Sequence, residues 1–471
     1  MMLWLTFGMA VFGLTTAVTA LDPVEAYGNK FFNKNGSQFF IKGMPSWRGG
    51  ATILLADEGP GPGVAYQLDS DDPLLDADQC QRDSSLMKEL GVNTIRVYHV
   101  DPDGDHDGCI KALSDAGIYI LVDMDTFGTY IEPTTNYWNS TKYDRYSKVM
   151  DAFHGYDNVL GFFVGNENIA KQEDSPTAPY IKAAARDMKA YRDHRGYRKI
   201  PVGYSAADIM QLRPMLQDYL TCGGNSSEIV DFFALNSYSW CDPSTYETST
   251  YDKLEEYARD FPVPIFFSET GCNVPGPRVW DDQDAIFGRP MVDDWSGAII
   301  YEWIQETNKY GLISYGPPAG SSQQGGGDVI DGFTRKGTPT PVSPDFDNLK
   351  TKWAAAHPTG VSRKDYDAQK VSTRACPTST AGGWWQVGGN VELPALDRAP
   401  TGALSSQASA SSRSKSSKAS SSASSTPQPS DSKGQSGDGK KGDDSVGSRD
   451  RDVTALGAIA AGIVLALALL L

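Results

Sequence analysis

Residues that commonly bind metals or polyanions are scarce or poorly placed in this chain. The five histidines are scattered, and the six cysteines lack close C-x-x-C spacing, so the sequence contains no recognisable set of metal ligands. Basic residues are outnumbered, with 42 Lys and Arg against 59 Asp and Glu, and the net charge is −17. This charge argues against nucleic acid and anionic membrane surfaces as partners. We therefore expect neither a metal site nor a nucleic-acid partner.

Apolar runs that could direct the chain to a membrane are confined to its two ends. Residues 1–20 have an apolar centre followed by small residues, which is typical of a secretory signal peptide, although the start is not strongly basic. Residues 453–471 carry no charge and follow a polar spacer at 437–448. This pattern favours a GPI-attachment signal over a permanent transmembrane helix. We therefore predict a secreted protein that is anchored through GPI.

The region before this tail is poor in apolar residues. Residues 405–436 are dominated by Ser, with Ala, Lys and Pro, and offer too little apolar surface to offset the entropy cost of folding. We interpret this region as a disordered Ser-rich stalk that carries O-linked sugars. The folded part is then about 22–394, a length that suits one large α/β barrel.

The cysteines and three short motifs agree with a secreted chain. All six cysteines lie in the folded part, and an even number in a secreted protein predicts three disulfides. N-glycosylation sequons begin at Asn35, Asn139 and Asn225. On spacing alone, each of these asparagines is a candidate surface site.

Short apolar or β-branched runs alternate with segments of helical periodicity along the folded part. The eight runs are 39–43, 94–98, 119–123, 159–165, 200–204, 231–235, 263–268 and 297–301. Helical spacing of apolar residues is seen at 80–90, 144–154, 180–194 and 251–261. This alternation predicts an α/β fold, the (β/α)8 TIM barrel, whose active site forms at the C-terminal ends of the strands.

Two glutamates occupy matching positions in this pattern. Glu167 and Glu269 each stand where an apolar run meets a loop, which is where such a barrel carries its catalytic carboxylates. Retaining glycoside hydrolases need two carboxyl groups that face each other across a sugar. The alternative is a pair of solvated surface groups, but a glutamate that ends a buried run is less often of that kind.

Other polar and aromatic residues at the ends of the runs are typical of a carbohydrate-binding cleft. They are Tyr98, Asp123, Asp125, Asn166, Asp208, Asn236, Tyr238, Tyr301 and Glu302. Asn166 could bond the 2-hydroxyl of a bound sugar, and Tyr238 and Tyr301 could orient the nucleophile. Alternatively, the additional carboxylates cap helices or pair with Arg, and the tyrosines pack at the rim.

Several motifs make the chain resemble a known family over about residues 22–377. They include Val64-Ala-Tyr-Gln67, Asn93-Thr-Ile-Arg-Val-Tyr98, Gly161-Phe-Phe-Val-Gly-Asn-Glu167, Pro201-Val-Gly-Tyr-Ser-Ala-Ala-Asp208 and Phe266-Phe-Ser-Glu-Thr-Gly-Cys-Asn273. These motifs resemble the fungal cell-wall β-1,3-glucanosyltransferases of glycoside hydrolase family 72. Such enzymes cut an internal β-1,3-glucan bond, hold one part as a glycosyl-enzyme and pass it to another glucan chain. The resemblance implies no metal or organic cofactor.

The resemblance also implies a role for each matching residue. Glu167 would be the acid/base and Glu269 the nucleophile. Donor-side contacts would come from Tyr98, Asn166 and Tyr301, acceptor-side contacts from Asp208 and Arg213, and further cleft contacts from Tyr66, Gln67 and Tyr238. The implied disulfides are Cys80 with Cys109, Cys222 with Cys376, and Cys241 with Cys272. No cysteine follows Cys376, so we do not expect the cysteine-rich glucan-binding module that some members of the family carry.

The chain departs from the family pattern at three places. Thr270 follows the nucleophile where the family usually has Tyr, and Asn168 follows the acid/base where an aliphatic residue is common. We expect these two changes to affect acceptor choice or the balance of transfer and hydrolysis. The third departure is an additional segment at 44–63, for which one hypothesis is a retained intron. A peptide of the mature protein that contains Trp47 would refute that hypothesis.

These observations predict a monomeric, GPI-anchored cell-wall enzyme that elongates β-1,3-glucan. Two alternatives are a β-1,3-glucan hydrolase, with water as the acceptor, and a non-catalytic glucan-binding wall protein. The predicted regions are a signal peptide (1–20), a catalytic barrel (22–345), an extension tied to the barrel by a disulfide (346–396), a Ser-rich stalk with a GPI spacer (397–448) and a GPI-attachment tail (449–471).

Overall fold

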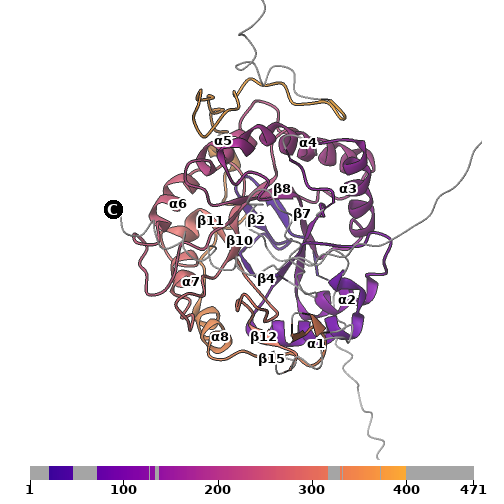
Figure 1. Cartoon of the computed structure of the whole chain (residues 1–471), viewed down its shortest axis with the longest axis vertical. Coiled ribbons are helices and arrows are strands. Elements are labelled where there is room, and N and C mark those ends of the chain that lie inside the picture. The colour runs from indigo at the N-terminus through magenta and orange to yellow at the C-terminus, as the bar shows by residue number, and fades with distance from the viewer. Residues whose placement is uncertain are drawn as a thin grey trace, which may run out of the picture. The chain divides into compact units, whose positions relative to one another are not determined.

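The computed structural model describes residues 21–45, 72–126, 128–132, 137–316, 329–330, 332–371 and 373–398. Eight parallel strands follow one another around a closed barrel, which confirms the predicted TIM barrel (Figure 1). They are β4 (Ile41–Pro45), β5 (Thr94–Val97), β6 (Tyr119–Asp123), β7 (Val159–Asn166), β8 (Val202–Ala207), β9 (Phe232–Asn236), β10 (Ile265–Thr270) and β11 (Trp295–Ile300). All eight predicted runs overlap a barrel strand.

Helices surround the barrel in Figure 1. They are α1 (Ala77–Leu90), α2 (Asp107–Ala116), α3 (Ser140–Phe153), α4 (Ala178–His194), α5 (Arg213–Thr221), α6 (Tyr251–Ala258), α7 (Asp281–Ile286) and α8 (Asp345–Ala355). Short 3-10 helices are η1 (Pro73–Leu75), η2 (Gln172–Thr177), η3 (Met291–Asp293) and η4 (Ala368–Lys370). Local sequence signals fix the ends of the α-helices. In α1, for example, the Asp76 side chain caps the first turn, and Gly91, whose φ is 96°, follows the last residue. Within the described residues, no helix is both long and apolar enough to cross a bilayer.

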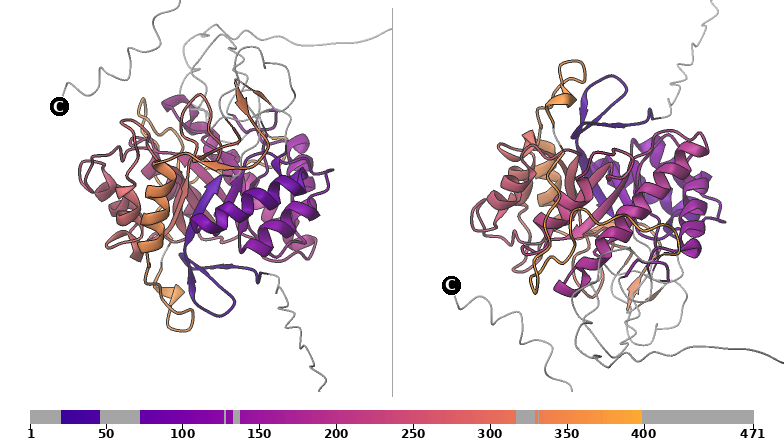
Figure 2. Two further views of the ribbon diagram at one scale, coloured as in Figure 1. Left: turned by 90° about the horizontal axis from the view of Figure 1, so that it is seen from below. Right: turned by 90° about the horizontal axis from the view of Figure 1, so that it is seen from above.

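An aromatic core fills the end of the barrel opposite the predicted site. Phe163, Phe232 and Phe266 are fully buried there, at ring-centroid distances of 5.0 to 6.4 Å. Phe31 lies 6.1 Å from Phe266 and comes from a small antiparallel sheet of β1 (Glu25–Tyr27), β2 (Lys30–Phe32) and β3 (Gln38–Phe39). Figure 2 shows this indigo segment at one end of the barrel. The N-terminal sheet therefore closes the barrel floor and leaves the other end for the site.

Short paired strands also occur after β11. They are β12 (Ile313–Ser314) with β15 (Thr340–Pro341), and β13 (Val329–Ile330) with β14 (Phe333–Thr334). A polar contact on α1 fixes this part of the chain, because the Gln79 side chain donates to the Gly337 carbonyl (2.8 Å) and accepts from the Gly337 amide (2.8 Å). The connection after β11 is therefore held beside α1.

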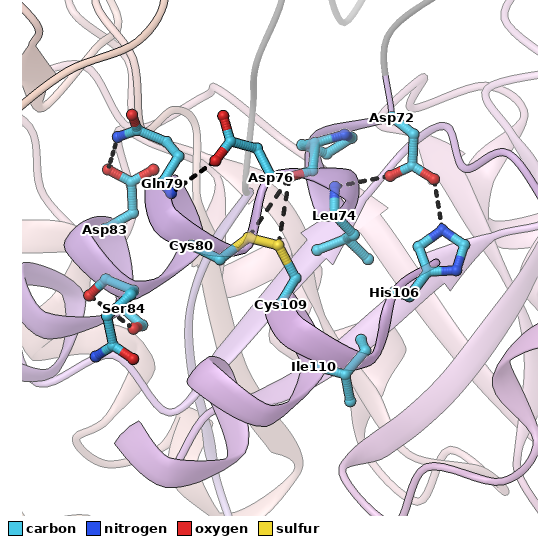
Figure 3. Close-up of a disulfide and its surroundings, with 12 residues drawn as sticks. Asp72, Leu74, Asp76, Gln79, Cys80, Asp83, Ser84, His106, Cys109 and Ile110 are labelled. Atoms are coloured by element: carbon cyan, nitrogen blue, oxygen red, sulfur yellow. Dashed lines mark hydrogen bonds and ion pairs between the residues drawn. A yellow bond between two sulfur atoms is a disulfide. The ribbon is translucent and has the colours of Figure 1, made fainter. Parts of the chain in front are cut away.

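The three disulfides pair as the family resemblance implied: Cys80 with Cys109, Cys222 with Cys376, and Cys241 with Cys272. Figure 3 shows the first of them, which joins α1 to α2. Beside it, the Asp72 carboxylate accepts from the Leu74 amide at 2.7 Å and pairs with His106 Nε2 at 2.7 Å. These contacts fix the start of the chain segment that enters α1.

The C-terminal extension after α8 packs on the outside of the barrel, where Figures 1 and 2 show it in orange and yellow along α4 and α5. Cys376 bonds to Cys222 at the end of α5. Trp385 is buried with its ring centroid 5.6 Å from that of Tyr219, and Arg186 on α4 donates to the Pro394 carbonyl. The extension is thus held to the barrel by one covalent link and by packing.

Several sequence predictions concern residues outside the described part of the chain. The signal peptide, the Ser-rich stalk and the GPI-attachment tail are among them. The additional segment at 44–63 begins inside β4, where Met44 pairs with Ile95 of β5, and its residues from 46 on lie outside the described residues. Of the sequon asparagines, Asn35 and Asn225 are exposed, and the half-buried Asn139 caps α3 by accepting from the Lys142 amide.

Candidate active site

The two predicted glutamates lie at the same end of the barrel. Glu167 directly follows β7, and its φ of 50° turns the chain sharply at that point. Glu269 lies in β10, in register with Asn236 on β9. The Asn236 side chain donates to Glu167 Oε1 at 3.0 Å. Because β7 and β10 run parallel in the same barrel, with β8 and β9 between them, both carboxylates reach the same mouth.

Glu269 is held rigidly by its neighbours. It is only 3% exposed. The Tyr98 hydroxyl donates to Oε1 at 2.8 Å, and the Tyr238 hydroxyl donates to Oε2 at 2.9 Å. Arg96 donates to Oε1 at 3.4 Å. Burial raises the pKa of Glu269, whereas Arg96 and the two hydroxyl donors oppose that rise by favouring the ionised form.

Glu167 has a different environment. It is half-buried, and Asn236 is the donor to its carboxylate. Burial is the main cause that raises the pKa of Glu167 to about 8, and the neighbouring Glu269 charge adds to the rise. Burial and the Glu269 charge both disfavour ionisation of Glu167, so Glu167 is the carboxyl group of the pair that is suited to hold a proton near neutral pH.

A buried arginine, Arg96 on β5, connects most of this site. It is fully buried and donates to both Asp123 carboxylate oxygens, at 2.9 and 2.6 Å. It also donates to Asn166 Oδ1 at 3.0 Å and to Ser205. Asp123 on β6 therefore pairs with Arg, as the structural alternative predicted. Arg96 is not among the site residues predicted from the sequence, although a cation inside an apolar run is a visible signal.

Two asparagines are fixed in orientation by this network. Asn236 accepts from Ser205 and Ser268, at 3.0 and 2.7 Å, and donates to Asn166 Oδ1 at 3.0 Å as well as to Glu167. Asn166 Oδ1 accepts from both Arg96 and Asn236, so its amide nitrogen is directed away from them. The sequence predicted Asn236 as a cleft residue at a strand end but gave it no individual role.

Three tyrosine rings form one wall beside Glu269. The ring centroids of Tyr238, Tyr301 and Tyr310 are 5.4 to 6.1 Å apart, with near-perpendicular planes. Tyr301 follows β11 and is 4% exposed. Edge-to-face packing of this kind rigidifies the rings and therefore the hydroxyl that Tyr238 donates to the nucleophile candidate.

Asp208 and Arg213 form an ion pair at the end of β8. Arg213 Nε donates to Asp208 Oδ1 at 2.7 Å, and the Ser237 hydroxyl donates to Oδ2 at 2.7 Å. Arg213 is 3% exposed and also donates to Gln217. The arginine therefore positions Asp208, which is the more exposed member of the pair.

The two single-residue departures from the family pattern are buried and hydrogen-bonded to other parts of the protein. Thr270 is 1% exposed and lies against Tyr251 and Asp282 on the outer helices. Asn168 is buried and donates to the Ile131 carbonyl at 2.9 Å. Alternation along β10 turns Thr270 outward next to the inward Glu269. The expected effect of these two residues on acceptor choice, or on the balance of transfer and hydrolysis, stays a prediction, and for Thr270 it would act through packing.

Not every predicted site residue can be placed. Tyr66 and Gln67 lie outside the described residues. Glu302, another strand-end carboxyl, is fully buried and accepts from Asn308 at 2.8 Å. In the described ranges, no group of three or more His, Cys, Asp or Glu side chains could hold a metal ion.

A protonated carboxyl and a tightly hydrogen-bonded carboxylate at the mouth of a closed parallel barrel define the class of glycoside-bond-processing barrel enzymes. The chain belongs to one family of that class, the glucanosyltransferases of glycoside hydrolase family 72, whose profile matches residues 14–324.

Fungal proteins are similar to the chain over most of its length. pH-responsive protein 1 of Candida albicans is 38% identical over 378 residues, which cover 79% of this chain and 64% of that protein. The 1,3-beta-glucanosyltransferase GAS2 of Saccharomyces cerevisiae is 36% identical over 366 residues, which cover 77% of this chain and 61% of that protein. The chain therefore spans somewhat less than two thirds of these relatives.

Solved structures of the same yeast protein are similar in fold. A Glu→Gln mutant of Saccharomyces cerevisiae Gas2p in complex with laminaritetraose and laminaripentaose has a TM-score of 0.65 and 34% identity, covering 78% of this chain and 74% of that one. A crystal structure of Gas2 in complex with a ligand named compound 11 has a TM-score of 0.67 and 34% identity, covering 80% of this chain and 78% of that one.

Proposed function

We propose that this protein is a retaining β-1,3-glucanosyltransferase that cleaves an internal bond of a β-1,3-glucan and transfers the new end to another glucan chain. The observation that carries the proposal is the contrast between the two glutamates. Glu269 receives three hydrogen bonds that favour its ionised form, whereas the pKa of Glu167 is raised to about 8. Family membership and the laminari-oligosaccharide complex of Gas2p support β-1,3-glucan as the substrate.

In the first step, Glu269 attacks the anomeric carbon of the donor while the glycosidic C–O bond breaks. Glu167 gives its proton to the leaving oxygen, so the reducing-side fragment departs as an alcohol. The glycosyl group then remains as an ester on Glu269. Asn166, whose amide nitrogen is directed away from Arg96 and Asn236, is suited to donate to the 2-hydroxyl of that sugar.

In the second step, a hydroxyl of the acceptor glucan loses its proton to the Glu167 carboxylate and attacks the anomeric carbon. The ester bond to Glu269 breaks, and both glutamates return to their starting states. Asp208, fixed by Arg213 and Ser237, is suited to bind the acceptor. A hydrolase would differ only in the attacking group, with water in place of the sugar hydroxyl.

The proposal includes a location outside the cell, where wall glucan is found. Three disulfides support an oxidising compartment. We propose that the protein acts as a monomer at the outer face of the plasma membrane and in the cell wall, attached through the GPI signal that the sequence predicts.

The two glutamates can be tested with isosteric variants. We expect Glu167→Gln and Glu269→Gln each to lower glucan transfer by at least about 10³-fold, because each removes a reacting group. The matched control is Glu173→Gln, an exposed glutamate on η2. Melting temperatures should remain close to wild type in all three variants. Full turnover by either active-site variant would overturn the assignment.

A further inference from the structure

Asp125, two residues beyond the end of β6, is a buried carboxyl group without a role in the mechanism described above. It is only 8% exposed. Within the described part of the chain, its carboxylate receives a hydrogen bond only from its own backbone amide. Its neighbour Asp123 differs, because the Arg96 guanidinium occupies both oxygens of that residue. Burying a carboxyl group without partners costs free energy, which a bound ligand would recover.

The alternation along β6 directs Asp125 toward the barrel mouth. Leu121 packs in the inner aromatic core and Asp123 points inward to Arg96, whereas Met124 packs outward against the helices. The ladder with β7 continues to Met124, whose amide donates to the Phe163 carbonyl at 2.9 Å. Asp125 is the next inward position, one layer above the ion pair of Arg96 and Asp123.

Charged and titratable groups surround Asp125, but burial is the main cause of its raised pKa. They are Asp123 on the same strand, Arg96 on β5, His99 beyond β5, Tyr146 on α3 and Tyr204 on β8. Burial raises the pKa of Asp125 to about 8, Asp123 adds to the rise, and Arg96 opposes it. A protonated carboxyl offers one hydrogen-bond donor and one acceptor, the combination that matches a sugar hydroxyl.

We propose that Asp125 binds a hydroxyl group of the donor glucan through a paired hydrogen bond. The donor side is favoured by the strand order, because β6 lies between β5 and β7. The proposed donor-side contacts Tyr98 and Asn166 stand at the ends of these two strands, whereas the proposed acceptor-side contact Asp208 follows β8. This inference rests on the proposed function, and it adds to that function a substrate contact outside the reacting pair.

The test measures glucan binding without turnover. Purified full-length Glu167→Gln protein serves as the parent, which also removes the titration of Glu167. A β-1,3-gluco-hexaose is titrated by calorimetry at pH 6 and at pH 9.5. At pH 6, Asp125→Ala should weaken binding about tenfold, whereas Asp125→Asn, which keeps a donor and an acceptor, should stay within about threefold of the parent. Asp103→Ala, an exposed carboxylate, is the matched control.

The pH dependence supplies a second readout that does not need the alanine variant to fold. The parent should bind more weakly at pH 9.5, because ionised Asp125 no longer donates, whereas Asp125→Asn should bind equally at both pH values. Equal affinity of parent and Asp125→Ala, or an unchanged pH dependence in Asp125→Asn, would overturn the inference while leaving the proposed function intact. Absence of hexaose binding by the parent would overturn the proposed substrate and this inference with it.

Discussion

At the scale of single residues, the site shows how one residue type receives two roles from its surroundings. Glu167 and Glu269 occupy similar sequence settings, but only Glu269 receives hydroxyl donors from Tyr98 and Tyr238. The position of both glutamates at strand ends was therefore predictable from the sequence. The division of roles depends on contacts between strands far apart in the chain, and a single sequence does not reveal such contacts without a known relative.

The pH dependence of transfer follows from the pKa of Glu167, which is about 8. Glu167 must be protonated to assist the leaving group, so kcat/KM should fall about tenfold per pH unit above pH 8. A donor with an activated leaving group needs little acid assistance, so the fall of kcat/KM above pH 8 should largely disappear for that donor. Pre-steady-state or steady-state rates between pH 5 and 10 would check this. An alkaline limb that begins well below pH 8, or the same alkaline limb for both donors, would contradict the assignment.

Arg96 is expected to contribute to both stability and activity. Arg96→Met should destabilise the protein by about 3–5 kcal/mol, because Asp123 is left buried without its partner. Urea unfolding of the purified variant measures this cost. The double variant with Asp123→Leu should recover much of the stability but not the transfer activity, since Glu269 and Asn166 still lack their donor. A double variant with normal activity would show that Arg96 serves stability alone.

At the scale of elements, periodicity predicted the strands of the barrel but not the N-terminal sheet that covers one end of it. The predicted run at 200–204 begins two residues before β8, because Pro201 cannot donate to the ladder and the strand starts after it. The N-terminal sheet was not predicted as a separate element. Its strands have two or three residues each, which is too short for a reliable period, and Phe31 becomes a core residue only through its contacts with Phe232 and Phe266.

The disulfides should contribute unequally to the stability of these elements. Cys222 and Cys376 are 154 residues apart and Cys80 and Cys109 are 29 apart. Chain entropy predicts a loss of about 5 kcal/mol for the longer loop and about 4 kcal/mol for the shorter when each pair is changed to Ala. Denaturant unfolding of the two double-alanine variants tests the order. A larger loss for the shorter loop would show that native packing, rather than loop length, decides the effect.

At the scale of the whole molecule, the sequence predicted the fold class and the family more completely than the site. The strand pattern, the even number of cysteines and the charge were each visible without a structure. The hydrogen bonds that join Arg96 and Asn236 through Asn166 were not, because they form only when β5, β7 and β9 meet at one end of the barrel. An uncharged polymer such as β-glucan is also compatible with a molecule whose net charge is −17.

The most direct measurement of the central claim is the length of the products formed from one defined donor. The purified protein is incubated with a reduced β-1,3-gluco-oligosaccharide, and the products are separated by size, with Glu269→Gln as the inactive control. The account predicts products longer than the donor together with the shorter fragments released in the first step. Shorter fragments alone would contradict glucanosyl transfer and identify water as the acceptor.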